Sequence, residues 1–170
     1  MTPRTLKGMN LFVDGKGHAG KVDELTLPTL KRKTVEHQAG GMPAPVAIDM
    51  GMEKLEAGFT LQDFDPQILA LFGLFSEDGT SVRFKGSLAN NDGSGTEIPV
   101  EVAMRGHFSQ VDMGTWKAAE AAPIKIDVAV IYYKYQQGGQ DIIEIDPLNH
   151  VEKINGIDRL ASRRANLGIA

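Results

Sequence analysis

The segment with the clearest chemical pattern is residues 15–20, Gly-Lys-Gly-His-Ala-Gly, which matches the G-x-G-x-x-G form of dinucleotide-binding loops. In such loops the glycines open a long apolar helix inside a βαβ unit, and the pyrophosphate lies on the helix N-terminus. Here Pro28 soon interrupts the following segment, and no alternation of strands and helices comes after it. Asp14-Gly15 is also a strong hairpin-turn signal. The sequence therefore favours a turn between two strands over a nucleotide site.

The other side chains that could catalyse a reaction or bind a metal are scattered. The four histidines form no H-x-x-x-H pair, and the chain has no cysteine, which excludes thiolate metal sites and cysteine nucleophiles. The oxygen-rich stretch 90–97 lacks the spacing of a calcium loop. The acidic residues Asp141, Glu144 and Asp146 are more typical of a charged strand edge than of a glycosidase pair. We expect no catalytic, cofactor-binding or metal-binding residues.

Length and charge narrow the class of protein further. The chain has 170 residues with 18 Lys and Arg against 22 Asp and Glu, a net charge of -4, and this length suits one domain over residues 1–170. Mild acidity argues against tight, non-specific binding to duplex DNA. No apolar run approaches the roughly 18 residues of a membrane helix, so we expect no stable membrane insertion.

Alternation with a period of two residues dominates the elements that must position any functional side chain. Residues 98–105 place apolar side chains on every even position, and Val82, Phe84 and Leu88 repeat this pattern, as in strands with one buried face. The turn-rich tip 90–95 between them predicts a hairpin. Residues 46–52 have apolar even positions and residues 55–61 apolar odd positions. This change of phase indicates one long strand with a β-bulge, although a turn at 51–54 between two strands gives the same pattern.

The second half of the chain adds a strand that is apolar on both faces and two short helices. Residues 124–135 require cover on both sides, and the turn Gly138-Gly139 leads into a strand at 142–145. Asp65-Pro66 provides an N-cap and a first helical residue for a helix that ends at Gly73. We expect a second helix over 157–167. The fold class is mainly β, a sandwich or barrel, with one short helix packed on the sheet and a C-terminal helix.

Residues 28–41 have no sustained apolar face. A structureless loop of this length is unusual in a compact domain, so the alternative is a strand that is polar on both sides and extends into water or onto a partner. The segment contains Lys31, Arg32 and Lys33, part of an uneven distribution of charge: residues 1–45 carry 7 − 4 = +3 and residues 46–170 carry 11 − 18 = -7. This basic region is either a docking surface or a chance cluster.

Taken in order along the chain, these segments resemble the major tail tube proteins of contractile-tailed bacteriophages, the FII family, and equally the tube protein of R-type pyocins. The matching stretches are Leu11–Gly15, Leu25–Leu30, Ala39–Met42, Ala44–Val46, Asp49–Gly51, Arg105-Gly106, Val111–Gly114, Trp116-Lys117, Tyr132–Lys134, Glu144–Pro147, Asn155–Ala161 and Leu167-Gly168. The resemblance covers nearly the whole chain, and residues 74–97 match less well.

The resemblance implies a structural protein without enzymatic activity. Such proteins form hexameric rings that stack into a rigid tube inside a contractile sheath, bounded by baseplate and terminator proteins. The tube is a conduit for double-stranded DNA in a phage, which passes without tight binding, or a membrane-piercing tube in a pyocin-like particle (tailocin). The implied location is the virion or tailocin particle, assembled in the bacterial cytoplasm.

For this chain, the resemblance implies that the polar segment is part of an extended hairpin at about 28–62. This hairpin pairs with neighbouring subunits or faces the lumen of the tube. Its candidate residues are Lys31, Arg32, Lys33, Glu36, His37, Asp49, Glu53 and Glu56. Trp116 and Tyr133 are candidate interface anchors, because aromatic residues are favoured in binding hot spots. For Trp116, the single tryptophan, a role as a core residue under a loop is the alternative.

A stand-alone β-sandwich that binds a small ligand or peptide is the competing function. A stand-alone module is expected to distribute its polar and apolar surface differently from a tube subunit. A monomer is not expected to carry both a hairpin that is polar on two sides and a strand that is apolar on two sides.

Overall fold

The computed structural model describes residues 2–169, which fold into a mainly β structure with two helices. The strands are β1 (Thr5–Val13), β2 (Lys16–Gly17), β3 (Val22–Thr26), β4 (Arg32–His37), β5 (Val46–Met52), β6 (Leu55–Leu61), β7 (Thr80–Ala89), β8 (Glu97–Asp112), β9 (Ile124–Gln137), β10 (Gln140–Asp146), β11 (Val151–Ile154) and β12 (Ile157–Asp158). The helices are α1 (Pro66–Leu69) and α2 (Ala161–Leu167).

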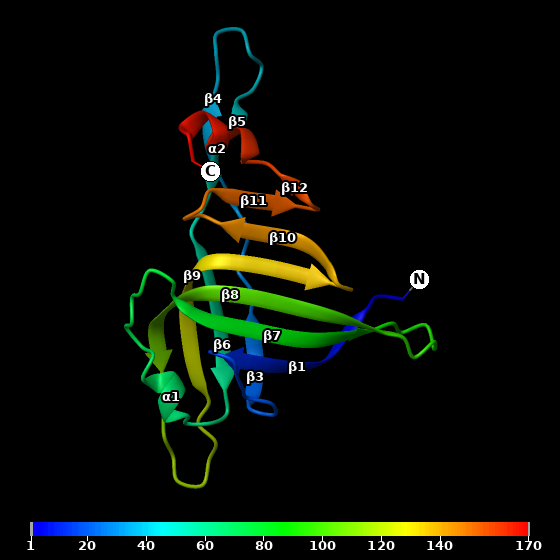
Figure 1. The fold of residues 1–170 in the computed structure, drawn as a ribbon, viewed down its shortest axis with the longest axis vertical. Helices are drawn as coiled ribbons and strands as arrows, with labels where there is room; N and C mark the ends of the chain where they lie inside the picture. Colours follow the sequence, from blue (N-terminus) through cyan, green and yellow to red (C-terminus); the bar gives the residue numbers. More distant parts are fainter. Residues whose placement is uncertain (1, 170) are drawn as a thin grey trace.

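Ten strands form one antiparallel sheet that folds back on itself. Its order is β12-β11-β10-β9-β8-β7-β1-β2, and β6 pairs with both β3 and β9 off this path. In Figure 1 β7, β10 and the adjoining parts of β8 and β9 run across the molecule, whereas β3, β6 and the remaining parts of β8 and β9 run along its longest axis. The core lies between these two layers and includes Leu11, Phe59, Val82, Phe108 and Ile126, each at most 2% exposed. The expected sandwich or barrel with helices at its margin is confirmed.

The sheet bends where β8 and β9 change their register. Between Arg105 and Gly106 on β8, the partners on β9 jump from Tyr132 to Val130, so Ile131 is an extra residue on β9. A bulge of this kind bends a strand and reverses the faces of the residues beyond it. Even residues of β9 therefore face the core up to Val130, and the odd residue Tyr133 faces it afterwards. This phase change explains the two apolar faces of 124–135, for which the sequence had suggested cover on both sides.

A bulge also occurs within β5, just before the phase change predicted between residues 46–52 and 55–61. Arg32 pairs with Met52 and Thr34 with Asp49, so β5 has one more residue than β4 over this stretch. β5 and β6 follow one another along the same direction in Figure 1, without a reversal of the chain. They belong to different sheets, because β4 and β5 form a separate two-stranded sheet. The polar segment is thus a strand, β4, within an extended hairpin.

The predicted turns are in place. Asp14 and Gly15 both have positive φ, at 47° and 81°, and they join β1 to the short β2, so the G-x-G-x-x-G match is a hairpin. Strands β7 and β8 pair from Thr80–Gly106 to Ala89–Glu97 around the tip at 90–96. Gly138 and Gly139, also at positive φ, join β9 to β10.

Both helices are shorter than expected. The Asp65 side chain accepts a hydrogen bond from the Gln67 N–H and caps α1, but α-helical geometry ends at Leu69. The prediction of a helix beginning at Ile157 is wrong, because Asn155 and Gly156 adopt positive φ and turn the chain so that Ile157 pairs with Ile154. Helix α2 begins only at Ala161 and ends at Leu167, with Gly168 as its C-cap. Neither helix in residues 2–169 has the length and apolar character needed to cross a membrane.

Candidate assembly surface

The hairpin β4–β5 projects from the body with an apolar face in water. Val35, Val46, Ile48 and Met50 are each about half exposed. Val35 lies opposite Ile48 across the two strands. Val46 shares the face of Ile48, because residues at i and i+2 of a strand do so, and Met50 follows at the bulge between Asp49 and Met52. We call these four residues the hairpin stripe. Within residues 2–169 neither β4 nor β5 pairs with a further strand, so both outer edges offer unpaired N–H and C=O groups.

A charged clamp fixes the base of this hairpin to the body. The Arg32 guanidinium donates from Nη1 to Glu152 Oε1 at 2.7 Å and from Nε to Asp49 Oδ1 at 3.1 Å. Glu152, on β11, is only 6% exposed. Its partner on β10 is the core residue Ile145, so this carboxylate points to the core side of the sheet. The hydrogen bonds that Arg32 donates to Asp49 lower the pKa of Asp49. The hydrogen bonds that Arg32 donates to Asp49 and Glu152 raise the pKa of Arg32.

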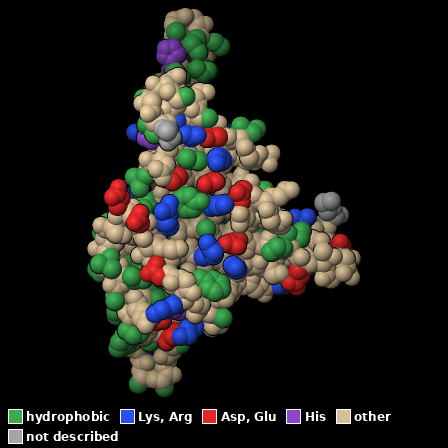
Figure 2. Space-filling model, viewed as in Figure 1, with side chains coloured by type: hydrophobic (Ala, Val, Ile, Leu, Met, Phe, Trp, Pro, Cys, Tyr) green, Lys and Arg blue, Asp and Glu red, His purple; other side chains and the backbone are tan. Residues whose placement is uncertain are grey.

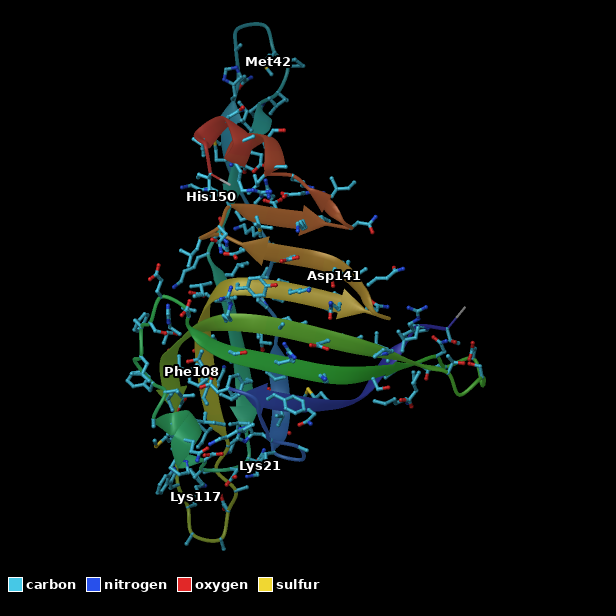
Figure 3. All side chains as sticks on the ribbon, viewed as in Figure 1. Lys21, Met42, Phe108, Lys117, Asp141 and His150 are labelled. Carbon is cyan, nitrogen blue, oxygen red and sulfur yellow. The ribbon has the colours of Figure 1, made fainter. Side chains whose placement is uncertain are left out.

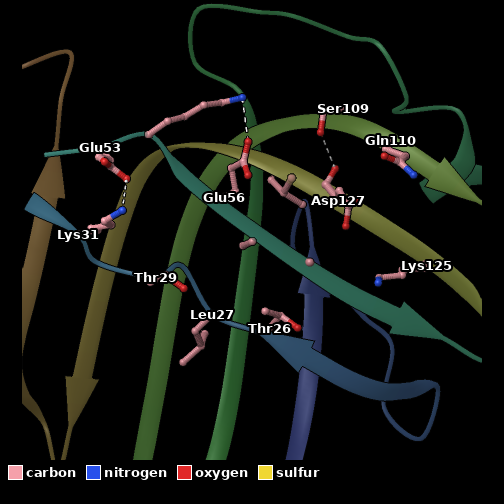
Figure 4. Close-up of a pocket in the computed structure, with 14 residues that line it drawn as sticks. Thr26, Leu27, Thr29, Lys31, Glu53, Glu56, Ser109, Gln110, Lys125 and Asp127 are labelled. Carbon is pink, nitrogen blue, oxygen red and sulfur yellow. Dashed lines mark hydrogen bonds and ion pairs between the residues drawn. The ribbon is translucent and has the colours of Figure 1, made fainter. Parts of the chain in front are cut away.

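Other predicted hairpin residues line a polar hollow of about 530 Å³ beside the clamp (Figure 4). Lys31 pairs with Glu53 at 3.6 Å and Lys54 pairs with Glu56 at 3.0 Å. These charges neutralise one another in water. Across residues 2–169 no group of three His, Cys, Asp or Glu side chains could hold a metal ion.

The remaining predicted hairpin residues lie further out on β4. Lys33, Glu36 and His37 are exposed, and none of them forms an ion pair with another residue in the range 2–169. The structure therefore separates the eight predicted residues into two groups. Arg32, Asp49, Lys31, Glu53 and Glu56 have partners within the chain, whereas Lys33, Glu36 and His37 face solvent.

The two predicted aromatic anchors differ in their surroundings. Trp116 is 67% exposed, so it is not a core residue. Its Nε1–H donates to the Met113 carbonyl at 3.1 Å, and its ring lies edge-on to Phe64, with the centroids 5.1 Å apart. Tyr133 is 4% exposed and belongs to the core, where burial raises the pKa of its hydroxyl to about 12. Tyr133 therefore has no surface to offer a partner.

The outer face of the large sheet carries paired charges of both signs. Arg83 pairs with Glu101 at 3.2 Å and Lys134 with Asp141 at 3.4 Å, while the Arg105 guanidinium lies 4.7 Å from the centre of the Tyr132 ring. Figure 2 shows Lys and Arg interspersed with Asp and Glu across this face, with no field of a single sign. The basic region of residues 1–45 is neutralised in part, because three of its seven basic residues, Lys21, Lys31 and Arg32, have acidic partners in the chain.

The sequence did not predict that several further apolar residues are exposed. Phe72, Leu74 and Phe75 are each more than half exposed beside α1, and α2 buries none of its residues. Both segments have the apolar spacing of elements that pack on a core. The sequence pattern does not distinguish packing within one chain from packing between chains, so no signal identified them in advance.

Comparison with known proteins gives this surface a context. The family model described as phage tail tube protein FII matches residues 3–168. The chain belongs to the FII family of phage tail tube proteins. It is 36% identical over 170 residues to the tail tube protein of Escherichia phage P2, covering 98% of each chain. It is 32% identical over 156 residues to the major tail tube protein of Serratia phage KSP20, covering 91% of this chain and 89% of the relative.

The FII fold is shared with a contractile system outside phages. A chain from the sheath–tube complex of an extracellular contractile injection system, PVC, in its extended state superposes with a TM-score of 0.60. The match covers 79% of this chain and 91% of that one at 10% identity, which establishes a common fold. This chain is thus a tail tube protein of contractile phage-like systems, as its sequence had indicated.

Proposed function

We propose that this tail tube protein assembles into hexameric rings that stack into the hollow inner tube of a contractile tail or a pyocin-like particle. The observation that carries the proposal is the free-standing hairpin β4–β5. It has an apolar stripe in water, both strand edges are unpaired within residues 2–169, and its base is fixed by a charged clamp. The role is structural rather than catalytic.

The hairpin is costly in an isolated subunit. Fully burying a Val, Ile or Met side chain contributes about 1.5–3 kcal/mol relative to leaving it in water, and open strand edges invite pairing with other chains. Repeated contacts between unlike surfaces close into a ring when the rotation between subunits allows it. A ring in which each hairpin packs on its neighbour buries the stripe and satisfies the edges.

The outer face of the large sheet suits the wall of a water-filled channel. Its Lys and Arg side chains have acidic or aromatic neighbours, as in the pairs Arg83–Glu101 and Lys134–Asp141. Tight binding of duplex DNA depends on cations free to displace counterions from its phosphates. In a phage, double-stranded DNA therefore passes this wall without being held.

The proposed partners follow from the same assembly. The tube is surrounded by a sheath, bounded by terminator and baseplate proteins, and put together in the bacterial cytoplasm before it becomes part of the particle. The fold shared with a chain from a sheath–tube complex supports this context.

Electron microscopy of the purified protein at increasing concentration tests the proposal. Wild-type protein is expected to form rings and hollow tubes, and Ile48→Lys, in the hairpin stripe, is expected to remain as folded subunits. Lys85→Ala is the matched control, because Lys85 is exposed on β7, away from the hairpin. If wild type and Ile48→Lys both stay monomeric at every concentration and salt, the proposal fails and the chain is a stand-alone binding module.

A further inference from the structure

An exposed aromatic cluster lies at one end of the molecule. Phe64, Met113 and Trp116 are 43%, 41% and 67% exposed, and we call them the aromatic knob. The knob is fixed in place by the edge-on contact of its two rings and by the bond from Trp116 Nε1–H to the Met113 carbonyl. Because the indole N–H already has a partner, the knob offers an apolar surface with no unsatisfied donor. Such rigid aromatic groups lose little conformational entropy when they bind.

An apolar groove lies towards the other end of the same axis. It has a volume of about 350 Å³ and lies between the hairpin base, the middle of β9, the start of β11 and α2. Its lining includes Met52, Ile131, Leu148, Val151, Leu160 and Arg163. Figure 3 shows this separation, with Lys117 beside the knob at the lower end and His150 beside the groove in the upper half.

Charges beside the two surfaces are complementary. Arg163 lines the groove and forms no ion pair with any residue in the described range 2–169. Asp112 adjoins the knob, and its carboxylate accepts a hydrogen bond from the Gly114 N–H at 2.9 Å. Lys125 lies opposite Asp112 on β9, but Asp112 forms no ion pair with any residue in that range. An unpaired cation beside the groove and an unpaired anion beside the knob favour one relative orientation.

We propose that the groove is a docking site for the aromatic knob of a second copy of this chain, with Arg163 of one copy facing Asp112 of the other. A ring requires contacts between two unlike patches on opposite sides of each subunit, and the groove and the knob meet this requirement. The assignment rests on the proposed function, since it identifies which surfaces join neighbouring subunits. A central aromatic residue in an apolar site with a charged rim is also the usual form of a binding hot spot.

Trp116 itself reports the contact, because it is the only tryptophan in the chain. In assembled rings or tubes its emission is expected to shift to the blue. Quenching by acrylamide is expected to fall at least about threefold relative to dilute subunits, as for an indole that leaves water. Tubes in which quenching is unchanged overturn the docking site while leaving the tube function intact. A failure to form rings or tubes contradicts the proposed function and this assignment together.

Cross-linking identifies the groove as the partner, and the cysteine-free chain makes the experiment specific. Lys117→Cys subunits and Leu148→Cys subunits are mixed, assembled and treated with a short bismaleimide. A cross-linked dimer of the two variants is expected from the mixture and from neither variant alone, because the contact joins unlike surfaces. Lys85→Cys, on the outer face of β7, replaces Leu148→Cys as the control and yields no dimer with Lys117→Cys. Equal cross-linking to position 85 and position 148, or none to position 148, contradicts the assignment.

Discussion

At the scale of single residues, the clamp at Arg32 shows how a surface position acquires a structural role. Arg32 belongs to a basic triplet whose sequence suggested docking, but its guanidinium is engaged by Asp49 and the buried Glu152. Glu152 lies 120 residues away along the chain, so no local pattern could have connected the two. The residue types of the hairpin were predictable from its sequence, whereas the distinction between paired and free charges depended on the fold.

Removing the clamp is expected to destabilise the subunit. Arg32→Ala leaves the Glu152 carboxylate on the core side of the sheet with only Arg159, at 3.8 Å. Hydrogen bonds to charged groups contribute about 1.5–3 kcal/mol, and a buried charge without its partner adds to the loss. We expect the free energy of unfolding to fall by about 2 kcal/mol in urea denaturation at concentrations that keep subunits apart.

Arg83→Ala provides the matched comparison. It breaks an exposed pair with Glu101, and such pairs contribute at most about 1 kcal/mol. Equal losses for Arg32→Ala and Arg83→Ala would contradict a special role for the buried carboxylate.

Acid is expected to weaken the subunit through aspartates held by hydrogen bonds. Arg164 lowers the pKa of Asp158, and Gln136 followed by Lys134 lowers that of Asp141. The pKa of each of these aspartates in the folded state lies below the unfolded value of 3.8. As the pH falls, the unfolded chain therefore binds these protons before the folded chain does. The stabilisation is therefore complete above that value and is lost as the pH falls through the folded pKa. Urea midpoints measured from neutral pH down to about 2 should decline below about 4, and less steeply in Asp158→Asn. An identical decline in both proteins refutes this role for Asp158.

At the scale of elements, period-two alternation predicted the hairpin of β7 and β8 and the strands β9 and β10, but the bulges decided where the sheet bends. The phase change between β5 and β6 was visible in the sequence because the apolar residues switch from even to odd positions. The bulge at Ile131 was hidden, because apolar residues on both faces of β9 resembled a strand covered on both sides. Helix α2 was predicted to begin too early, because Asn155 and Gly156 serve equally well as helix caps and as a hairpin turn.

Gly106 is expected to be the glycine least tolerant of substitution at the bend. A Cβ added there would lie 2.4 Å from the Ala129 carbonyl oxygen, and both strands are fixed by partners on either side. Gly106→Ala should lower the free energy of unfolding by about 3 kcal/mol or more. Gly8→Ala on β1 is the control, since a Cβ there meets nothing within 4 Å. The thermal midpoints of the two variants provide the test, and similar values would show that the bend can relax.

At the scale of the whole molecule, the exposed apolar surfaces define what one chain leaves incomplete. The hairpin stripe, the aromatic knob and α2 are in contact with water in the single subunit. The sequence left the basic region of residues 1–45 as either a docking surface or a chance cluster. The structure favours apolar contacts between subunits over charged ones, because most of the basic residues near the hairpin already have acidic partners.

The charge of Lys33 is expected to contribute to assembly, but less than the exposed apolar surfaces do. This residue is exposed on β4 and has no ion-pair partner in the described part of the chain. Exposed ion pairs contribute about 0.2–1 kcal/mol, so Lys33→Glu should raise the concentration needed for assembly by about threefold, with unchanged stability of the subunit. Lys31→Glu, next to its partner Glu53, is the comparison. Sedimentation measures both, and assembly of Lys33→Glu at the wild-type concentration would remove Lys33 from the interface.

A hollow tube requires that copies of this single chain close into a ring. Cryo-electron microscopy of the purified wild-type protein, with class averages of end-on views, measures this without any variant. We predict hexameric rings around an open channel, stacked into tubes, with the hairpin β4–β5 packed against a neighbouring subunit. A chain that remains a monomer at all concentrations, or that associates without enclosing a channel, would contradict the account.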